Sequence, residues 1–553
     1  MKKKLFIILS LIVPLVSMSV QAQPSAAKQK LLKLKTYKTG GELLSSSYAC
    51  IIDKDGTTLS SWTPFVGADS AVVTDASGRS YRVEKIIGAN ELYNIARFEV
   101  SGVPATLQIA LAKSAPSASS SLWVMTDSPV KTTLLRTEKF MEKYNFYVLN
   151  TNSTLNADKT TYPDGSPVVT DKGELVGMYN NGVSVLSATD YNYGKELQPN
   201  AFSGKDPTLR QTSIRKALPN DYKSAQVALM MLADGRKSDF MDAARDFIKM
   251  FPKQNDGYSS LANSYLSDGN VAEADKLLQQ AIANATDKGE AHYNYSRAIW
   301  QKVAMQPEPP YGDWTFDKAM TEADAAYKID PQPAYDEMKA KIDYGKGNYQ
   351  AAYDKFIGLT KTSLRNPELY LEAAQSKEHL NAPDAEILSL LDSAVAVCDT
   401  PYTSIAAPFF YARGNQYAKM GRYRDATFDL YRYELLSNSI QSVDFYYNRE
   451  QMEMKARLYK YAIDDINRAL LLDTKNAMLW CEKANVHMRV NQLDDALRSA
   501  DEALKLDDSA SAAYIIKGIV QCEKGNKTDG LANLEKAKTL GDTQADTFIK
   551  KYK

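Results

Sequence analysis

The spacing of apolar residues along the chain changes near residue 205. Before this point, β-branched and aromatic residues alternate with polar ones in short runs such as "YACIIDKDGTTLSS" and "SAVVTDASGRSYRVEKIIG". Turn-forming pairs such as Asp55-Gly56 bound these runs. An alternation of period two between such turns predicts an antiparallel β-barrel or sandwich over residues 28–200.

From Tyr222 onward the apolar residues follow a helical period, after a polar, proline-containing stretch at 201–221 that we interpret as a linker. A frame of 34 residues counted from Ala407 places Phe410 at position 4 and Gly414 at position 8. Small residues at positions 8 and 20 let two helices approach closely, whereas large residues at 4 and 11 fill the space to the next unit. The pattern therefore predicts stacked helix pairs.

The same frame recurs along the second half of the chain. Further copies start at Asn255, Val443, Ala477 and Ser511. The pattern resembles the tetratricopeptide repeat (TPR) family, which implies an all-α solenoid of about nine units over residues 222–542 and a capping helix at 543–553. The third unit carries the insertion "MQPEPPYGDW" between its helices, and the fifth, at 366–401, departs from the frame.

The first residues, "MKKKLFIILSLIVPLVSMSVQAQ", have the features of a secretory signal peptide. Three lysines precede an apolar run from Leu5 to Val16, and Val20-Gln21-Ala22 is a small-residue cleavage pattern. The run is shorter than the roughly 20 residues of a spanning helix. We therefore expect cleavage after residue 22, no lipoprotein anchor, and a periplasmic or secreted protein.

Charge and cysteine content exclude several classes of function. Without the three leader lysines, 64 basic residues face 67 acidic ones, a net charge of −3, which favours neither nucleic acid nor insertion into a membrane. The four cysteines show no zinc-type spacing, so we expect neither metal nor cofactor. Cys481 and Cys522 are offset by seven residues in adjacent units, about 10 Å along the helices, which predicts free thiols.

Three segments of the β half, "CIIDKDGTTLSSWTPFVGA", "NIARFEV" and "YPDGSPVVTDKGELVGM", resemble the trypsin-like serine peptidases, especially the periplasmic Deg-type branch. The resemblance covers roughly residues 40–197 and implies a trypsin-like antiparallel β-barrel. Carried over by position, the catalytic histidine of the family corresponds to Thr63, the aspartate to Asn94 and the serine to Asp164. All three are substituted, so the resemblance implies a catalytically degenerate domain.

A displaced nucleophile is the alternative for this domain. The glycine after the family serine is retained as Gly165, and Ser166 follows it as a fallback nucleophile. Ser166 precedes Pro167, which has no N–H for an oxyanion hole. All three histidines lie in the repeat region: His292, His379 and His487. A serine–lysine dyad would need a lysine in a pocket, whereas lysines such as Lys172 lie on expected turns.

The TPR resemblance also implies a peptide-binding groove. Positions 5, 9 and 13 of the first helix line the concave face in that family, and here they supply the candidates Tyr411, Asn415 and Lys419; Tyr447, Gln451 and Lys455; and Asn485 and Arg489. Amides and basic groups there could bind an extended peptide and its carboxylate. Family members that clamp a terminal carboxylate have lysine at position 5, which Tyr411 and Cys481 replace here.

These inferences favour one function over two alternatives. We expect an exported, noncatalytic interaction scaffold that has a pseudo-peptidase domain and binds protein or peptide partners through the repeats. The first alternative is a divergent serine endopeptidase whose repeats recruit substrate. The second is a structural component of an envelope or secretion assembly.

Overall fold

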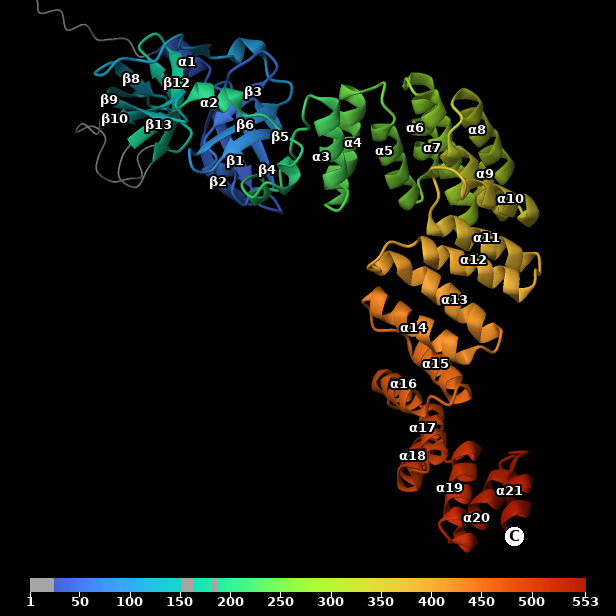
Figure 1. The fold of residues 1–553 in the computed structure, drawn as a ribbon. Helices are drawn as coiled ribbons and strands as arrows, with labels where there is room; N and C mark the ends of the chain where they lie inside the picture. The colour runs from blue at the N-terminus through green and yellow to red at the C-terminus, as the bar shows by residue number, and fades with distance from the viewer. Residues whose placement is uncertain (1–23, 151–162, 182–185) are drawn as a thin grey trace, which may run out of the picture. The chain divides into compact units, whose positions relative to one another are not determined.

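The computed structural model describes residues 24–150, 163–181 and 186–553 and forms two compact units, Met1–Asp287 and Lys288–Lys553 (Figure 1). The expected signal peptide lies outside the described residues. A β domain followed by α-helical repeats is observed, which confirms the predicted fold class. Within the described ranges, no helix has both the length and the apolar character needed to cross a bilayer.

The first six strands form a closed barrel in the order β1-β2-β3-β6-β5-β4. Residues 32–37, "LKLKTY", alternate buried and exposed positions, so Leu32 and Leu34 enter the core beside Phe98. The strands are β1 (Leu32–Tyr37), β2 (Leu43–Ile51), β3 (Thr57–Ser60), β4 (Ser70–Thr74), β5 (Ser80–Asn90) and β6 (Ile95–Val100). The alternation thus builds a barrel interior, as period two requires.

A second sheet follows in the order β11-β8-β9-β10-β13-β12-β7, and an additional β11–β12 pairing closes six of its strands into a ring. Its core includes Val168, Val176 and Tyr179. The strands are β7 (Ala110–Leu111), β8 (Ser121–Val124), β9 (Val130–Phe140), β10 (Tyr144–Leu149), β11 (Pro167–Thr170), β12 (Glu174–Asn181) and β13 (Leu186–Asp190). Short α1 (Ser25–Gln29) and α2 (Tyr191–Glu196) flank the strands.

Residues 201–221, which we interpreted as a linker, pack against the first barrel. Leu209 and Ile214 are buried in its core, and the N–H of Gly67 donates to the carbonyl of Gln211 at 2.7 Å. Lys216 pairs with Ile86 of β5 as an isolated parallel bridge. The segment contains the short helices η3 (Ser203–Lys205) and η4 (Leu209–Gln211). The segment is polar in overall composition, but the apolar side chains of Leu209 and Ile214 fill part of the barrel core.

The helices of the first unit follow directly. They are α3 (Tyr222–Leu232), α4 (Lys237–Met250), α5 (Asp256–Ser267) and α6 (Val271–Asn284). The carboxylate of Asp246 on α4 accepts a hydrogen bond from Arg215 at 2.9 Å and lies 3.5 Å from the ammonium of Lys85 on β5. Charged hydrogen bonds therefore attach α4 to the barrel.

The second unit continues the succession of helix pairs. Its helices are α7 (Lys288–Met305), α8 (Phe316–Ile329), α9 (Pro333–Gly345), α10 (Tyr349–Leu359), α11 (Pro367–His379), α12 (Asp384–Val397), α13 (Ala407–Lys419), α14 (Tyr423–Ser437), α15 (Val443–Lys455), α16 (Tyr459–Leu472), α17 (Ala477–Arg489), α18 (Leu493–Leu506), α19 (Ser511–Glu523), α20 (Lys527–Thr539) and α21 (Ala545–Tyr552). Residues 366–401, which depart from the frame, still supply the pair α11 and α12.

The repeat frame coincides with the helix boundaries. The copies counted from Ala407, Val443, Ala477 and Ser511 start at the first residues of α13, α15, α17 and α19. Gly414 is buried, and a Cβ atom there would lie 3.2 Å from the side chain of Leu430. Close helix packing therefore explains the small residue at position 8.

Candidate functional site

The three positions that correspond to the triad come together in the β domain. Thr63 begins the short helix η1 (Thr63–Phe65), Asn94 ends the β5–β6 turn, and Asp164 precedes β11. The Oδ1 of Asn94 accepts hydrogen bonds from the N–H of Thr63 at 2.8 Å and from its Oγ1 at 2.9 Å. The Nδ2 of Asn94 donates to Oδ2 of Asp164 at 3.4 Å. The first barrel thus supplies two members and the second barrel the third.

The loop that carries Asp164 is fixed by further hydrogen bonds. The N–H of Asn181 donates to Oδ1 of Asp164 at 2.5 Å, and the hydroxyl of Ser47 donates to its carbonyl. Gly165 has φ +85°, and a Cβ atom there would meet Ser60 Oγ and lie 2.8 Å from Ser61 N. Glycine is retained because a side chain would collide with the first barrel.

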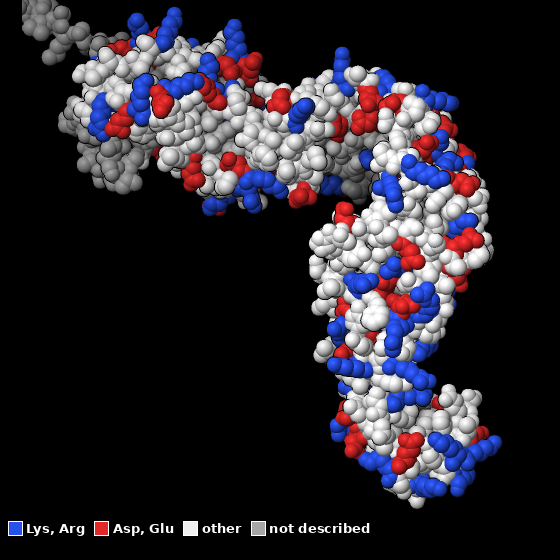
Figure 2. All heavy atoms as spheres, viewed as in Figure 1, with Lys and Arg blue, Asp and Glu red and all other residues white. Residues whose placement is uncertain are grey.

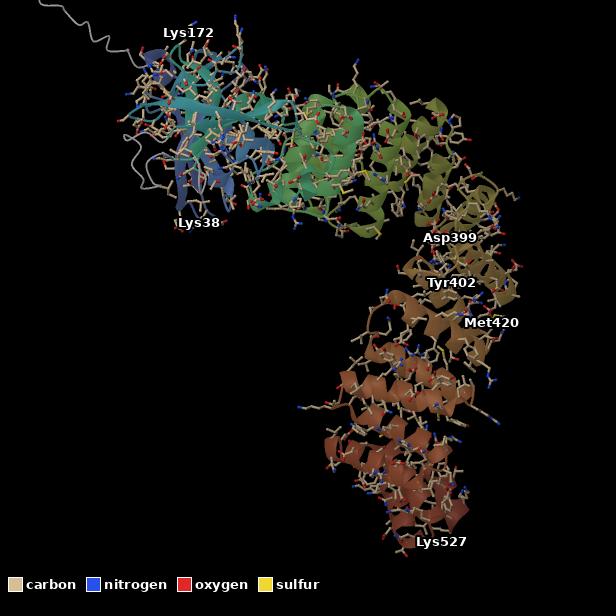
Figure 3. All side chains as sticks on the ribbon, turned by 60° about the vertical axis from the view of Figure 1, so that its left-hand side comes forward. Lys38, Lys172, Asp399, Tyr402, Met420 and Lys527 are labelled. Atoms are coloured by element: carbon tan, nitrogen blue, oxygen red, sulfur yellow. The ribbon has the colours of Figure 1, made fainter. Side chains whose placement is uncertain are left out.

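No proton acceptor suited to activating a hydroxyl faces this cluster among the residues that the structure describes. The side chain of Ser166 is fully buried, and its Oγ donates to the carbonyl of Pro163 at 2.9 Å. Lys172 is exposed at the turn between β11 and β12 (Figure 3). Nucleophilic catalysis by Ser166 would require an imidazole or a buried amine beside its hydroxyl. This geometry supplies neither.

The three histidines belong to the helical repeats, where each has a local partner. His292 on α7 lies 2.6 Å from Glu322, and His487 on α17 lies 2.7 Å from Gln492. The ring of His379 stacks on Tyr349 with centroids 4.3 Å apart. The four cysteines are free thiols, and the described residues contain no group of three or more His, Cys, Asp or Glu side chains that could hold a metal ion.

A hollow of about 450 Å³ opens between α13 and α15. Four of the predicted groove residues line it together: Tyr411, Asn415, Gln451 and Lys455. Tyr411 is 43% exposed, and the ammonium of Lys455 lies 5.0 Å from the ring centroid of Tyr423. The hollow therefore presents aromatic surface, amides, a cation and the exposed carboxylate of Asp444 to solvent, which suits an extended polypeptide.

Other predicted groove residues lie outside this lining. Lys419 is engaged with the preceding repeat, because its ammonium lies 3.1 Å from the carboxylate of Asp384. The remaining three are Tyr447, Asn485 and Arg489. The lining also includes Phe445 and Asn448, which the positions taken from the family did not identify. These two residues face the preceding repeat, so only the stacking of α15 on α13 and α14 brings them to the hollow.

Arg449 forms the buried floor of the hollow. Its guanidinium donates to both carboxylate oxygens of Asp465, at 2.6 and 2.8 Å, and to Glu434 at 2.7 Å. It also lies 3.8 Å from the ring centroid of Tyr431. Burial by itself lowers the pKa of Arg449, but the hydrogen bonds to the two carboxylates outweigh burial and raise that pKa. The guanidinium is therefore charged and held in place.

Two further carboxyl groups on α15 are buried beside this network. Burial, followed by the nearby Glu482, raises the pKa of Glu450 to about 8. Burial, followed by the nearby Asp465, raises the pKa of Glu453 to about 8. At neutral pH both carboxyls are therefore mainly protonated, because the dry interior disfavours their charged form.

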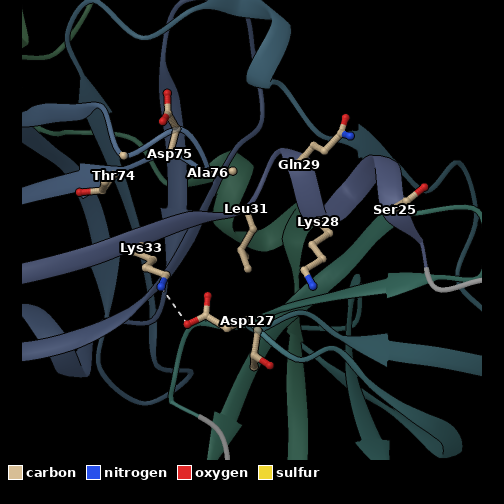
Figure 4. A pocket seen from close by; sticks show the side chains of 11 residues that line it. Ser25, Lys28, Gln29, Leu31, Lys33, Thr74, Asp75, Ala76 and Asp127 are labelled. Carbon is tan, nitrogen blue, oxygen red and sulfur yellow. Dashed lines mark hydrogen bonds and ion pairs between the residues drawn. The ribbon is translucent and has the colours of Figure 1, made fainter.

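A second hollow, of about 560 Å³, lies in the β domain (Figure 4). Its walls come from α1, the start of β1, the β4–β5 turn and the turn after β8. The ammonium of Lys33 pairs with Asp127 at 2.8 Å on one side. The triad-equivalent residues do not line it.

Comparisons with known proteins agree on the repeats. A tetratricopeptide repeat model matches residues 259–306 and 481–545. A curated relative, the TPR repeat-containing thioredoxin TDX of Arabidopsis thaliana, is 28% identical over 91 residues, which are 16% of this chain and 24% of the relative. The match thus spans about a quarter of that relative's length.

Three solved structures each align with about a third of this chain. YrrB, a TPR protein with an unusual peptide-binding site, is 21% identical and aligns over 35% of this chain and 97% of its own, with a TM-score of 0.29. The Rv3671c protease of M. tuberculosis, in its active form, is 10% identical over 31% of this chain and 81% of its own, with a TM-score of 0.26. The serine endoprotease of Yersinia pestis is 12% identical over 34% and 67%, with a TM-score of 0.26. The chain thus carries tetratricopeptide repeats in two segments of its helical region.

Proposed function

We propose that this chain is an exported, noncatalytic interaction protein that binds extended polypeptide segments in the hollow between α13 and α15. The observation that carries the proposal is the convergence of Tyr411, Asn415, Gln451 and Lys455 on one hollow. They come from positions 5 and 9 of one repeat and positions 9 and 13 of the next, and the match to the tetratricopeptide repeat model supports a role in protein binding.

The β domain acts as a pseudo-peptidase in this proposal. Two six-stranded rings with Thr63, Asn94 and Asp164 between them agree with the resemblance to trypsin-like peptidases. The hydrogen bonds within this cluster use the polar atoms that a peptidase would direct at its substrate. Loss of a triad typically lowers the catalytic rate by about 10⁶.

The peptide-binding role is tested with the full mature chain and a fluorescent, reduced and carboxymethylated protein as an unfolded probe. Lys455→Glu and the double variant Tyr411→Ala/Asn415→Ala are each expected to weaken binding about tenfold, equivalent to about 1.4 kcal/mol. Leu506→Ala, a change at an exposed side chain on α18, serves as the matched control. Unchanged binding in both groove variants would contradict the proposal.

The catalytic alternative is tested on the same sample. A fluorophosphonate probe and a denatured protein substrate are expected to give neither labelling nor cleavage. Activity that disappears in Ser166→Ala would instead establish a divergent peptidase.

Chemical crosslinking in the envelope fraction distinguishes the structural alternative, because a single large stable complex would contradict exchangeable binding of short segments.

Export is tested by the N-terminal sequence of the protein purified from its own cells. A mature chain that begins at Gln23 is expected from the cleavage pattern at Ala22. A chain that retains Met1 and remains in the cytoplasm would contradict this part of the proposal.

A further inference from the structure

The outer surfaces of α14 and α16 expose an unusual amount of apolar side chain. Leu435 is 77% exposed, Leu471 is 79% exposed, and Ile440 in the α14–α15 connection is 81% exposed. Phe428 and Tyr461, on the same two helices, are 55% and 45% exposed. We call these five residues the outer patch. Contiguous exposed apolar surface of this kind marks interaction sites.

The repeat frame shows that packing does not require this patch. Leu435 and Leu471 both occupy position 29 of their repeats, counted from Ala407 and Val443. The next two repeats place Lys505 and Thr539 at that position. Because the repeat accepts leucine, lysine or threonine there, the two leucines are not needed for the stacking of the helices.

The outer patch borders a third hollow, of about 670 Å³. Leu435 and Ile440 line it together with Tyr431, whose ring lies 5.6 Å from that of Tyr461. Arg468 of α16 donates to Glu434 of α14 at 2.9 Å, which joins the two helices across the hollow. Leu471 lies one helical turn beyond Arg468. Leu435 and Ile440 therefore line the hollow, and Tyr461 and Leu471 belong to the helix on its other side.

The exposed charged side chains at the rim of this hollow are basic. Position 26 is arginine in both repeats, and Arg432 and Arg468 are 56% and 44% exposed. Each also lies near a buried carboxylate, Arg432 at 3.6 Å from Asp429 and Arg468 at 3.9 Å from Asp465. Glu434 is largely buried, and its two oxygens already accept hydrogen bonds from Tyr446, Arg468 and Arg449. Elsewhere on the face in view, basic and acidic side chains are interspersed (Figure 2). In the following repeat position 26 is Glu502, so the positive rim belongs to these two repeats.

We propose that the outer patch is a second docking surface, which binds an amphipathic polypeptide segment carrying large apolar side chains beside carboxylates. The apolar side chains would enter the hollow at Leu435 and Ile440, and the carboxylates would pair with Arg432 and Arg468. Arginine suits this role because its planar guanidinium binds carboxylates through two hydrogen bonds. Apolar burial supplies the affinity, and the rim selects the sign of charge on the partner.

This surface is distinct from the hollow between α13 and α15. The lining of that hollow comes mainly from α13 and α15, whereas the outer patch comes from α14, α16 and the α14–α15 connection. Arg449 lies between the two surfaces and contacts residues of both. A variant of either surface can therefore be tested while the other is left intact.

The test uses the full mature chain and a fluorescent helical peptide of about 15 residues with leucines on one face and glutamates flanking them. Fluorescence anisotropy is expected to show saturable binding that weakens as salt is added. The double variant Leu435→Ser/Leu471→Ser should weaken binding about tenfold. Arg432→Gln should also weaken it, whereas Leu506→Ser, at an exposed leucine of the next repeat, should not.

Each alternative occupant of the outer patch predicts a different binding result. A peptide with lysines in place of the glutamates should bind more weakly, and equal binding would overturn the proposed chemistry. Self-association that disappears in Leu435→Ser/Leu471→Ser, measured by sedimentation, would identify a second copy of the chain as the occupant and overturn the proposal. Binding of the chain to phosphatidylglycerol vesicles, lost in the same variant, would overturn it in favour of a membrane surface. Lys455→Glu tests binding of the unfolded probe in the hollow between α13 and α15, and Leu435→Ser/Leu471→Ser tests binding of the helical peptide, so failure of this proposal is distinguishable from failure of the proposed function.

Discussion

The polar cluster of the β domain and the hollow of the helical repeats use their side chains in opposite ways. In the cluster, Thr63, Asn94 and Asp164 bond to one another and to neighbouring backbone. In the hollow, Tyr411 is 43% exposed and lines the space together with Asn415. The side chains of the cluster are paired with one another, whereas Tyr411 and Asn415 of the hollow are exposed to solvent.

This difference shows where binding energy is available. A polar group that is already satisfied within the protein gains little by exchanging its partner for a ligand. Groups that face water and are placed by buried neighbours can bind a ligand without first breaking internal bonds. The helical repeats are therefore the better candidate for recognition, and the β domain the better candidate for a stable support.

The largest expected effect on stability comes from the buried ion pair of Arg449 beneath the hollow between α13 and α15. Arg449→Met leaves the buried Asp465 without its partner and should lower the free energy of unfolding by about 3–5 kcal/mol. Arg413 and Asp429 occupy the same two repeat positions one repeat earlier, but the side chain of Arg413 is 14% exposed whereas that of Arg449 is fully buried. Arg413→Met should therefore cost less in chemical denaturation, and equal losses would show that burial does not decide the effect.

The next effect is a dependence of stability on pH that comes from the two buried carboxyls of α15. The carboxyls of Glu450 and Glu453 hold their protons in the folded chain up to a pKa of about 8, against 4.5 for the same groups when exposed. Their contribution to stability is complete below pH 4.5 and is lost as the pH rises through 8.

This dependence is measured by urea denaturation between pH 6 and pH 9. The charged groups near the two carboxyls are Asp465, Arg449 and Glu482, together with the phenol of Tyr431. Glu453→Gln keeps the shape of the side chain without its ionisation and should flatten the fall in stability between pH 6 and pH 8. An unchanged slope in this variant would assign the dependence to other groups.

A smaller loss is expected where the two barrels meet. Gly165→Ala places a Cβ atom against Ser60 and Ser61 at φ +85°. The left-handed conformation alone costs an alanine about 1–2 kcal/mol, and the collision adds to this. Gly78→Ala has a similar φ of +87° but open space around the added atom, so its smaller loss of melting temperature provides the control.

The smallest effect concerns the triad-equivalent cluster itself. Thr63→Val removes the 2.9 Å hydrogen bond to Asn94 but keeps the side-chain shape. The expected loss is about 1 kcal/mol of unfolding free energy, with no change in binding of the unfolded probe. A large loss of probe binding in this variant would show that the β domain takes part in recognition and would remove the contrast between the two regions.

Several features of the fold could be predicted because they depend on local periodicity. The alternation in "YACIIDKDGTTLSS" predicts strands that are observed as the end of β2 and as β3, and the 34-residue frame locates the first residues of α13, α15, α17 and α19. The separations of Thr63, Asn94 and Asp164 along the chain suggested the register that brings them together. The irregular repeat at 366–401 was harder to recognise, because its helix pair is formed by tertiary packing in spite of the altered spacing.

Other features depended on neighbours that are remote in the sequence. The polar composition of residues 201–221 indicated a linker, but Leu209 and Ile214 pack in the barrel. Lys419 has the spacing of a groove residue, yet it pairs with Asp384 of the preceding repeat. Neither contact leaves a periodic signal, because each joins one side chain to a partner in another element.

The sequence by itself determined the order of the two kinds of structure, the boundaries of the repeats and the absence of an imidazole from the β domain, since all of these follow from residue type and spacing. Only the tertiary structure decided which polar groups are satisfied internally, which carboxyls keep their protons, and that Leu435 and Leu471 remain exposed beside one hollow. The physical reason is that desolvation and hydrogen bonding depend on the three-dimensional neighbours of a side chain, which the spacing along the chain does not specify.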